Sequence, residues 1–408
     1  MGEKASIKRL QLTTFKLRSL LNITQAINEN LTQDKLLEHY ESILRKDLNI
    51  GKLVLFKLEE TWKCILAAGI TDKTQQEIDV EKYLLPIDEI EYVSTSDSEV
   101  LTNFDIVIPV IHNGKHIAFV LIGDIEESEG VSPVIKHLNF IQTISNIIIV
   151  AIENIRLFKE SLRQEAIKKE LELASKMQNM LIPHTSSLPN NDLVRMKAFY
   201  HPHLEVGGDY YDYIELNKEE FGFCISDVSG KGMSAALLMS NFQANLRALF
   251  TDEISLEALI GKLNERVISS TNGEKFITLF VGRYNLKTRE LEYINAGHNQ
   301  PILFLIKKEK LELLDQGCVG IGMLDEIPVF NKGKLTIEGP AKILCYTDGL
   351  VELMDGRGIS AETADLEECL ANNDSIEDNI NEIIKRQRVL EDSTPIFDDI
   401  SILGIQLF

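Results

Sequence analysis

The stretch FGFCISDVSGKGMSAALLMS, residues 221–240, decides the fold of the second half of the chain. In its first six residues large apolar side chains alternate with small ones, as in a β-strand, and a segment with helical spacing extends from near Ser234 to about Phe250. The two glycines of the SGKG turn permit a tight reversal because glycine has no Cβ to clash. The turn leaves the Asp227 carboxylate and a backbone carbonyl facing one cavity, an oxygen-rich environment suited to a hard cation.

Three other acidic motifs occupy similar places. Two glycines precede the acid in Gly207-Gly208-Asp209, the apolar strand predicted over 341–347 ends in Asp348-Gly349, and Phe397-Asp398-Asp399 leads into a final strand over 400–408. An Asp-Gly pair after a strand is, by itself, most often a turn. If the strands are neighbours in one sheet system, however, four carboxylates converge at one edge: Asp209, Asp227, Asp348 and Asp398.

Four carboxylates at such close range cannot all remain ionised unless cations compensate them or their pKa values rise. Two divalent ions about 3.5–4 Å apart, bridged by a carboxylate and a water, satisfy this charge and lower the pKa of bound water from about 15.7 toward about 7. A hydroxide nucleophile then exists at neutral pH. In-line attack by such a hydroxide suits phosphate monoesters, whose uncatalysed hydrolysis is among the slowest reactions known.

Six motifs lie in order between residues 172 and 408: ELASKMQNMLIP, VGGDYYDY, FCISDVSGKGMSAALLMS, FITLFVGRYNLKTRELEYINAGHNQP, CYTDGLVEL and FDDISILGI. Together they resemble the bacterial PPM (PP2C-type) phosphatases of the RsbU and SpoIIE kind, which act in partner-switching control of sigma factors. The resemblance implies an αββα sandwich of two antiparallel sheets with helices outside. It also implies hydrolysis of phosphoserine or phosphothreonine in a protein, with a STAS-type anti-sigma-factor antagonist as substrate. Gln300 departs from the family, which often has Pro there, but lies outside the acidic motifs.

The same resemblance implies roles for individual residues. Asp227 would bridge two Mn²⁺ or Mg²⁺ ions, with the Val228 carbonyl as a further ligand, and Asp348 and Asp398 would complete the shell of one ion. Asp399 is adjacent to the expected ligand, and which of Asp398 and Asp399 binds metal is left open. Asp209 is similar to the family's additional acidic residue, which acts directly or through water. The expected catalytic acids are therefore Asp209, Asp227, Asp348 and Asp398.

The first 158 residues predict a separate α/β domain. Two amphipathic helices are expected between about 7 and 47, with a break at Asn30-Leu31-Thr32, and a long helix is expected from near Ser132. Between them come four strands, the last two joined by the turn His112-Asn113-Gly114-Lys115: 52–58, 63–67, 106–111 and 117–122. This order resembles a GAF-like sensory domain over 15–158, after a helical extension over 1–14. The sequence does not specify the small molecule or protein that it senses.

Residues 148–182 predict one uninterrupted helix because they contain neither Pro nor Gly. Lys159 and Lys169 occupy seam positions of a heptad pattern formed by apolar residues: Ile148, Ile152, Ile155, Leu162, Ala166 and Leu173. The segment is therefore either a marginal, coiled-coil-like parallel stem that makes a homodimer or a plain interdomain helix. Pro183 ends it, so we expect a helical linker over 159–182 and the phosphatase domain over 183–408.

Bulk properties narrow the class of protein. A length of 408 residues predicts two domains, and a net charge of −21 disfavours nucleic acid and anionic membranes as partners. Five scattered cysteines without C-x-x-C spacing indicate neither a disulfide framework nor a zinc site. No run of about eighteen uninterrupted apolar residues occurs, so we expect no membrane-spanning segment and a cytoplasmic location.

Other function classes fit less well. The DVSGKG sequence lacks the hydroxyl residue after the lysine and the earlier glycine of a P-loop, and cyclases of the GGDEF kind lack the later acidic strand ends. His201, His203 and His298 have no His or Cys partner three or four residues away, so they are not expected to bind metal. The main alternative is a catalytically silent sensory or scaffold protein that binds a partner-switching component. Retention of all four acids disfavours it.

Overall fold

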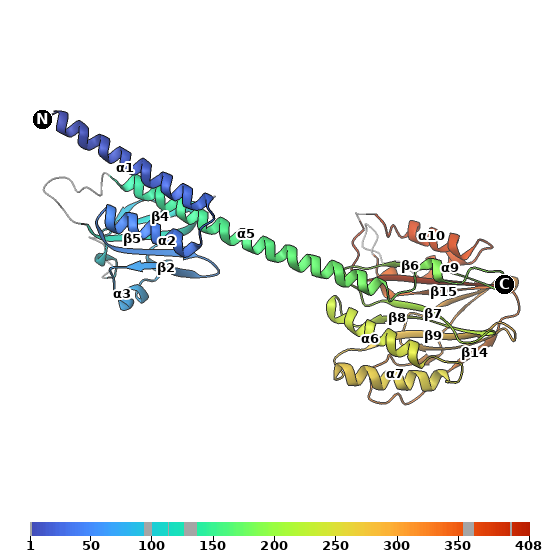
Figure 1. Ribbon diagram of the computed structural model, residues 1–408. Coiled ribbons are helices and arrows are strands. Elements are labelled where there is room, and N and C mark those ends of the chain that lie inside the picture. Colours follow the sequence, from blue (N-terminus) through green and yellow to red (C-terminus); the bar gives the residue numbers. More distant parts are fainter. Residues whose placement is uncertain (1, 94–99, 113, 126–136, 354–362, 392–393) are drawn as a thin grey trace. The chain divides into compact units, whose positions relative to one another are not determined.

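The computed structural model describes residues 2–93, 100–112, 114–125, 137–353, 363–391 and 394–408. The chain forms two compact units, Met1–Ala166 and Ile167–Phe408, and each is described by itself (Figure 1). The division falls inside the long helix α5 (Leu138–Asn179). The predicted domain boundaries at 158 and 183 stay predictions.

The N-terminal unit is built on a five-stranded antiparallel sheet in the order β2-β1-β5-β4-β3. Its strands are β1 (Ile50–Leu58), β2 (Trp62–Ala68), β3 (Glu91–Tyr92), β4 (Ile106–His112) and β5 (Lys115–Ile125). Besides α5, its helical elements are α1 (Gly2–Asn28), α2 (Gln33–Ser42), the π-helical turn η1 (Ile43–Asp47), α3 (Asp72–Gln76), α4 (Val80–Tyr83) and the 3₁₀ turn η2 (Leu101–Asn103).

Apolar side chains are buried on both faces of this sheet because successive residues of a strand point to opposite sides. In β1, Leu53 packs in a cluster with α1, α2 and α5, whereas the next residue, Val54, packs in a second cluster with α4. The buried hydroxyls of Tyr40 in α2 and Ser145 in α5 lie 2.6 Å apart and form a hydrogen bond. The unit therefore has a double-sided core, with α5 as one of its walls.

Most sequence predictions for this unit are confirmed. The predicted break at Asn30-Leu31-Thr32 separates α1 from α2, and β4 and β5 form the expected hairpin, with His112 opposite Lys115. Residue 113 of the predicted turn and the predicted helix start near Ser132 lie outside the described residues. The unit has an α/β fold, and its specific likeness to GAF domains stays a prediction.

The helix α5 is long and apolar enough, by length and composition alone, to cross a membrane. Half of its most apolar window is buried, and there Ile141, Ile144 and Ile148 pack in the core of the N-terminal unit. Core packing accounts for the buried half of this window.

The C-terminal unit contains two sheets. One has the order β13-β10-β9-β8-β7, with β14 also paired to β10, and the other has the order β12-β11-β15-β16-β6. The strands of the first sheet are β7 (Tyr210–Glu215), β8 (Glu220–Val228), β9 (Ile277–Asn285), β10 (Glu290–Ala296), β13 (Gly317–Cys318) and β14 (Gly333–Thr336). Those of the second are β6 (Val194–His201), β11 (Ile302–Leu305), β12 (Lys310–Leu313), β15 (Ala341–Tyr346) and β16 (Ile400–Leu407).

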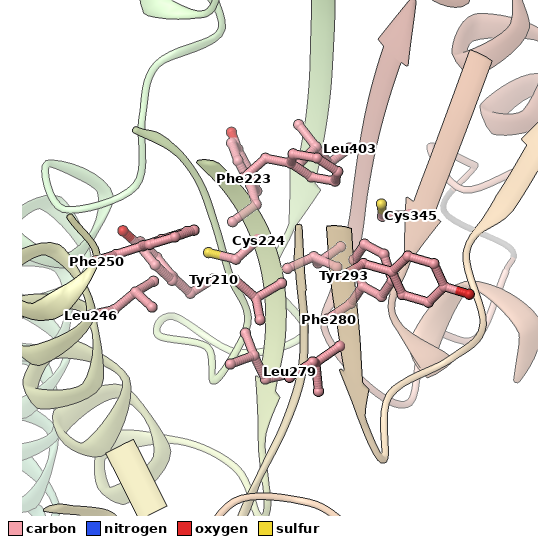
Figure 2. Close-up of a cluster of buried hydrophobic side chains, with 14 of the residues drawn as sticks. Tyr210, Phe223, Cys224, Leu246, Phe250, Leu279, Phe280, Tyr293, Cys345 and Leu403 are labelled. Atoms are coloured by element: carbon pink, nitrogen blue, oxygen red, sulfur yellow. The ribbon is translucent and has the colours of Figure 1, made fainter. Parts of the chain in front are cut away.

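The two sheets pack face to face, and helices cover their outer faces. Figure 2 shows Phe223 of β8 pointing toward Leu403 of β16, while the next residue, Cys224, lies on the side of Leu246 and Phe250. The helices α6 (Met233–Leu249) and α7 (Leu256–Thr271) pack on the first sheet, and α9 (Thr363–Leu370) and α10 (Ile376–Arg386) pack on the second. Apart from the parallel pairing of β13 with β10, all strand pairs are antiparallel. The predicted αββα sandwich is confirmed.

Candidate metal centre

The predicted site residues come from strand ends in both sheets. Asp209 immediately precedes β7, and Asp227 is the last but one residue of β8. Asp348 begins the short helix α8 (Asp348–Val351) just after β15, and Asp398 and Asp399 immediately precede β16. The predicted end of the strand at Ser226 was wrong by two residues: β8 continues to Val228, because Asp227 and Val228 pair with Thr278 and Ile277 of β9.

The structure brings these acids into one cluster. Asp227 lies close enough to Asp209, Asp348, Asp398 and Asp399 for these groups to act on its pKa. Burial first, and then the charges of Asp348 and Asp398, raise the pKa of Asp227 to about 7. Carboxylates at such close range resist simultaneous ionisation, so this cluster favours a retained proton when no cation is bound.

The other acids respond in the same direction. Asp209 is buried, and its burial, followed by the charges of Asp227 and Asp399, raises its pKa well above the ordinary value. Burial is also the main cause that raises the pKa values of Asp348 and Asp399. A cluster in which these four acids resist ionisation is one that a divalent cation would stabilise.

Asp398 and Asp399 have different surroundings although they are adjacent. The backbone N–H groups of His203 and Gly208 donate to the two carboxylate oxygens of Asp399, at 2.8 and 2.6 Å. The Asp398 carboxylate, 28% exposed, instead forms an ion pair at 2.8 Å with the Nζ of Lys231. Asp399 thus anchors the loop before β7, whereas Asp398 faces a partly exposed cationic side chain.

Thr347, which the sequence analysis did not single out, joins the two sheets beneath the cluster. Its hydroxyl donates to Asp209 Oδ2 at 2.8 Å and accepts a hydrogen bond from the backbone N–H of Ser401 at 2.8 Å. The sequence feature that could have indicated this role is a hydroxyl residue at the end of an otherwise apolar strand, directly before Asp348. Such a residue positions an acid from the opposite sheet.

The glycine pair before Asp209 is required by close packing. A Cβ on Gly207 would collide with the Asp399 carboxylate and with the hydroxyl of Tyr200, and a Cβ on Gly208 would lie 3.0 Å from the Val228 carbonyl oxygen. That approach also places the Val228 carbonyl beside the loop that carries Asp209. The backbone ligand expected from sequence therefore borders the cluster.

Gln178 near the end of α5 is a second residue that sequence reasoning missed. Its side-chain amide donates to the Gly207 carbonyl at 2.5 Å and accepts from the Gly207 N–H at 3.1 Å, and the side chain is buried. One polar residue in a long helix carries no local signal, so only the folded chain reveals this contact.

Other polar residues that flank the motifs have structural partners. Asp212 is buried and accepts two hydrogen bonds from Arg247, at 2.7 and 2.8 Å. The His298 ring pairs through Nδ1 with the Thr278 hydroxyl at 2.9 Å, and burial lowers its pKa to about 4, so it is neutral. Of the three histidines considered from sequence, His203 contributes to the cluster through its backbone.

The candidate donor atoms suit hard cations, although they are not yet arranged around one point. Within the described ranges, no three His, Cys, Asp or Glu residues are already arranged with metal-ligand spacing. All candidate donors are oxygens, the mutual repulsion of the acids raises pKa values, and a lysine ammonium already neutralises Asp398. The chemistry of these donors therefore fits Mn²⁺ or Mg²⁺.

Comparisons with known proteins agree with this geometry. Residues 217–408 match the family model described as Stage II sporulation protein E (SpoIIE), a range that begins after Asp209. The chain is 27% identical over 207 residues to the phosphoserine phosphatase RsbU of Bacillus subtilis (strain 168), covering 51% of this chain and 60% of RsbU. It is 26% identical over 189 residues to the phosphoserine phosphatase RsbP of the same organism, covering 45% of this chain and 46% of RsbP.

The chain spans about half the length of the curated relatives it matches. Among solved structures, the SiaA-PP2C domain of Pseudomonas aeruginosa superposes with a TM-score of 0.52 at 18% identity, covering 60% of this chain and 99% of that domain. This likeness establishes the fold of the C-terminal unit. The C-terminal unit is therefore similar in sequence to SpoIIE and to the phosphoserine phosphatases RsbU and RsbP, and it has a PP2C-like fold.

Proposed function

We propose that this chain is a metal-dependent protein serine/threonine phosphatase. The observation that carries the proposal is the cluster of acids contributed by both sheets, in which Asp227 has its pKa raised to about 7. The relatives named phosphoserine phosphatases support the same chemistry. Bound Mn²⁺ or Mg²⁺ would neutralise the acids and activate water for attack on phosphorus.

The surroundings of each residue support a division of roles. Asp227, whose pKa responds to the other acids of the cluster, would bridge two ions, with the Val228 carbonyl as a further ligand. Asp348 and Asp398 would complete one shell. Asp209, held by the Thr347 hydroxyl, would be the additional acid.

We assign Asp398 as the metal ligand and Asp399 as a positioning residue. Both carboxylate oxygens of Asp399 already accept backbone hydrogen bonds from His203 and Gly208. The Asp398 carboxylate accepts one backbone hydrogen bond, from the N–H of Asp399 at 2.9 Å, and its other oxygen pairs with the exposed Lys231, which a divalent cation can replace.

The substrate would be a phosphoserine or phosphothreonine on a STAS-type anti-sigma-factor antagonist in a partner-switching system. The supporting observation is the sequence similarity to RsbU and RsbP. A protein substrate also agrees with the position of the acids at an accessible end of the sandwich, where the Asp398 and Lys231 side chains are partly exposed.

Control by a GAF-like N-terminal domain would act through α5. Gln178 at the end of this helix holds Gly207, and the next residue, Gly208, donates to Asp399. A displacement of the helix end would therefore move the loop that carries Asp209. Exposed apolar residues on α5, such as Leu162 and Leu173, support a homodimeric stem.

The test is Mn²⁺-dependent hydrolysis of p-nitrophenyl phosphate and of a phosphoserine peptide by the full chain, with Asp227→Asn and a chelator as controls. We expect hydrolysis that requires the metal and disappears in the variant. A full chain that binds the phosphorylated partner protein but never hydrolyses it with metal would establish the alternative, a silent sensory scaffold.

A further inference from the structure

Lys231 places a positive charge directly on the acidic cluster. Its Nζ lies 2.8 Å from Asp398 Oδ2 and also donates to the Phe397 carbonyl oxygen. The lysine side chain is 46% exposed. One side of the Asp398 carboxylate is therefore covered by an accessible ammonium group.

The lysine lies at the tip of a turn with a fixed base. Gly230 and Gly232 on either side adopt φ values of +87° and +71°, which L side chains rarely adopt. At the base of the turn, the Ser229 carbonyl accepts a hydrogen bond from the Lys275 Nζ at 2.8 Å. The long, flexible side chain of Lys231 can therefore reorient without movement of β8.

The neighbouring base Lys275 is engaged by the backbone of the turn, where its Nζ donates to the Ser229 carbonyl. A phosphate monoester carries negative charge and would be repelled by the carboxylates around Asp227. Lys231 is thus the side chain placed to offset that repulsion.

The Lys231–Asp398 ion pair and a metal ion at Asp398 compete for the same carboxylate. A divalent ion on Asp398 weakens the attraction of this carboxylate for the ammonium group. The released ammonium is a point-charge donor of the kind that binds phosphate oxygens.

We propose that Lys231 forms a phosphoryl-binding subsite of this centre: it pairs with Asp398 in the metal-free chain and with an oxygen of the substrate phosphate monoester once Asp398 holds a metal ion. The inference rests on the proposed function because it concerns the same site. It predicts that loss of the lysine has opposite effects on two affinities. Metal affinity is kept or raised because a competitor of the metal is removed, and phosphate affinity falls because a ligand of the phosphate is removed.

The experiment is calorimetric titration of the full chain, first with Mg²⁺ and then, at saturating Mg²⁺, with inorganic phosphate. Lys231→Met should weaken phosphate binding on the order of tenfold, and its Mg²⁺ affinity should equal or exceed that of the wild type. Lys231→Arg, which keeps the cation, should retain most of the phosphate affinity. The matched control is Lys334→Met, which removes a similarly exposed, ion-paired lysine in β14 and should change neither affinity.

Three outcomes would overturn the inference: unchanged phosphate affinity in Lys231→Met, parallel loss of Mg²⁺ and phosphate affinity, or a wild-type chain that binds no phosphate. Parallel loss would mean that the lysine only maintains the shape of the turn. Hydrolysis assays on the same samples separate the two proposals. If phosphate binding depends on Lys231 but no hydrolysis occurs with Mn²⁺ or Mg²⁺, the subsite stands and the proposed phosphatase activity fails.

Discussion

Gln178 holds Gly207 through both ends of its side-chain amide, with Nε2 donating to the Gly207 carbonyl at 2.5 Å and Oε1 accepting from its N–H at 3.1 Å. The next backbone N–H, that of Gly208, donates to Asp399. Gln178, near the end of α5, is thus connected to Asp399 of the acidic cluster through hydrogen bonds to Gly207 and from Gly208.

Gln178→Leu should reduce both stability and metal-dependent activity. The substitution leaves the buried N–H and the buried carbonyl of Gly207 without partners. Each unpaired group lowers the free energy of unfolding by up to about 3 kcal/mol. Chemical denaturation and hydrolysis rates at saturating Mn²⁺ measure the two effects. Asn179→Leu, at the adjacent exposed position, is the control. Full activity of Gln178→Leu at saturating metal would show that the contact does not control the site.

Metal-free stability should carry a pH-dependent contribution from Asp227. Its folded pKa of about 7 lies above the ordinary value of 3.8, so the folded chain retains a proton that the unfolded chain releases. This stabilisation is complete below about pH 4 and is lost as pH rises through about 7, by roughly 4 kcal/mol at most. The difference in unfolding free energy between wild type and Asp227→Asn should therefore fall across this range.

The comparison with Asp227→Asn is needed because His298 acts in the opposite direction. Burial lowers its pKa to about 4, so its contribution to stability is lost as pH falls below about 6.5. Added Mn²⁺ should raise the melting temperature more at pH 8 than at pH 5, since cations bind ionised carboxylates. Equal metal-induced shifts at both pH values would contradict the role of these acids as ligands.

Asp398→Asn and Asp399→Asn should separate metal binding from structure. Asp398→Asn should weaken Mn²⁺ binding by at least about tenfold, with little change in folding, because its carboxylate has an exposed ionic partner. Asp399→Asn should lower the unfolding free energy by about 1–3 kcal/mol, because an amide nitrogen would face a backbone N–H of His203 or Gly208. Calorimetry measures Mn²⁺ binding and chemical denaturation measures the free energy of unfolding. Weaker metal binding in Asp399→Asn together with lower stability in Asp398→Asn would exchange the two assignments.

The oligomeric state should depend on the exposed apolar residues of α5. The double substitution Leu162→Glu and Leu173→Glu should convert a dimer to a monomer in light scattering, because like charges would meet at a stem seam. Leu390→Glu, at an exposed site on the C-terminal unit, should leave the mass unchanged. A wild-type monomer would favour the plain interdomain helix.

Local patterns were enough to predict much of this protein. Alternation within a strand, turn glycines and helical spacing depend on neighbouring residues. The strand that carries Asp227, the strand that precedes Asp348 and the break between α1 and α2 were therefore predictable. The end of β8 was misplaced because pairing with β9, rather than local composition, extends it to Val228.

Only the tertiary structure distinguished residues that look alike in sequence. Asp209 and Asp212 share one motif, yet the first joins the acidic cluster and the second is held by Arg247 on α6. Asp398 and Asp399 are adjacent, yet the backbone of a loop nearly two hundred residues away engages only the second. The physical reason is that burial, charge and hydrogen bonding at this centre arise from contacts between distant segments, which no local periodicity encodes.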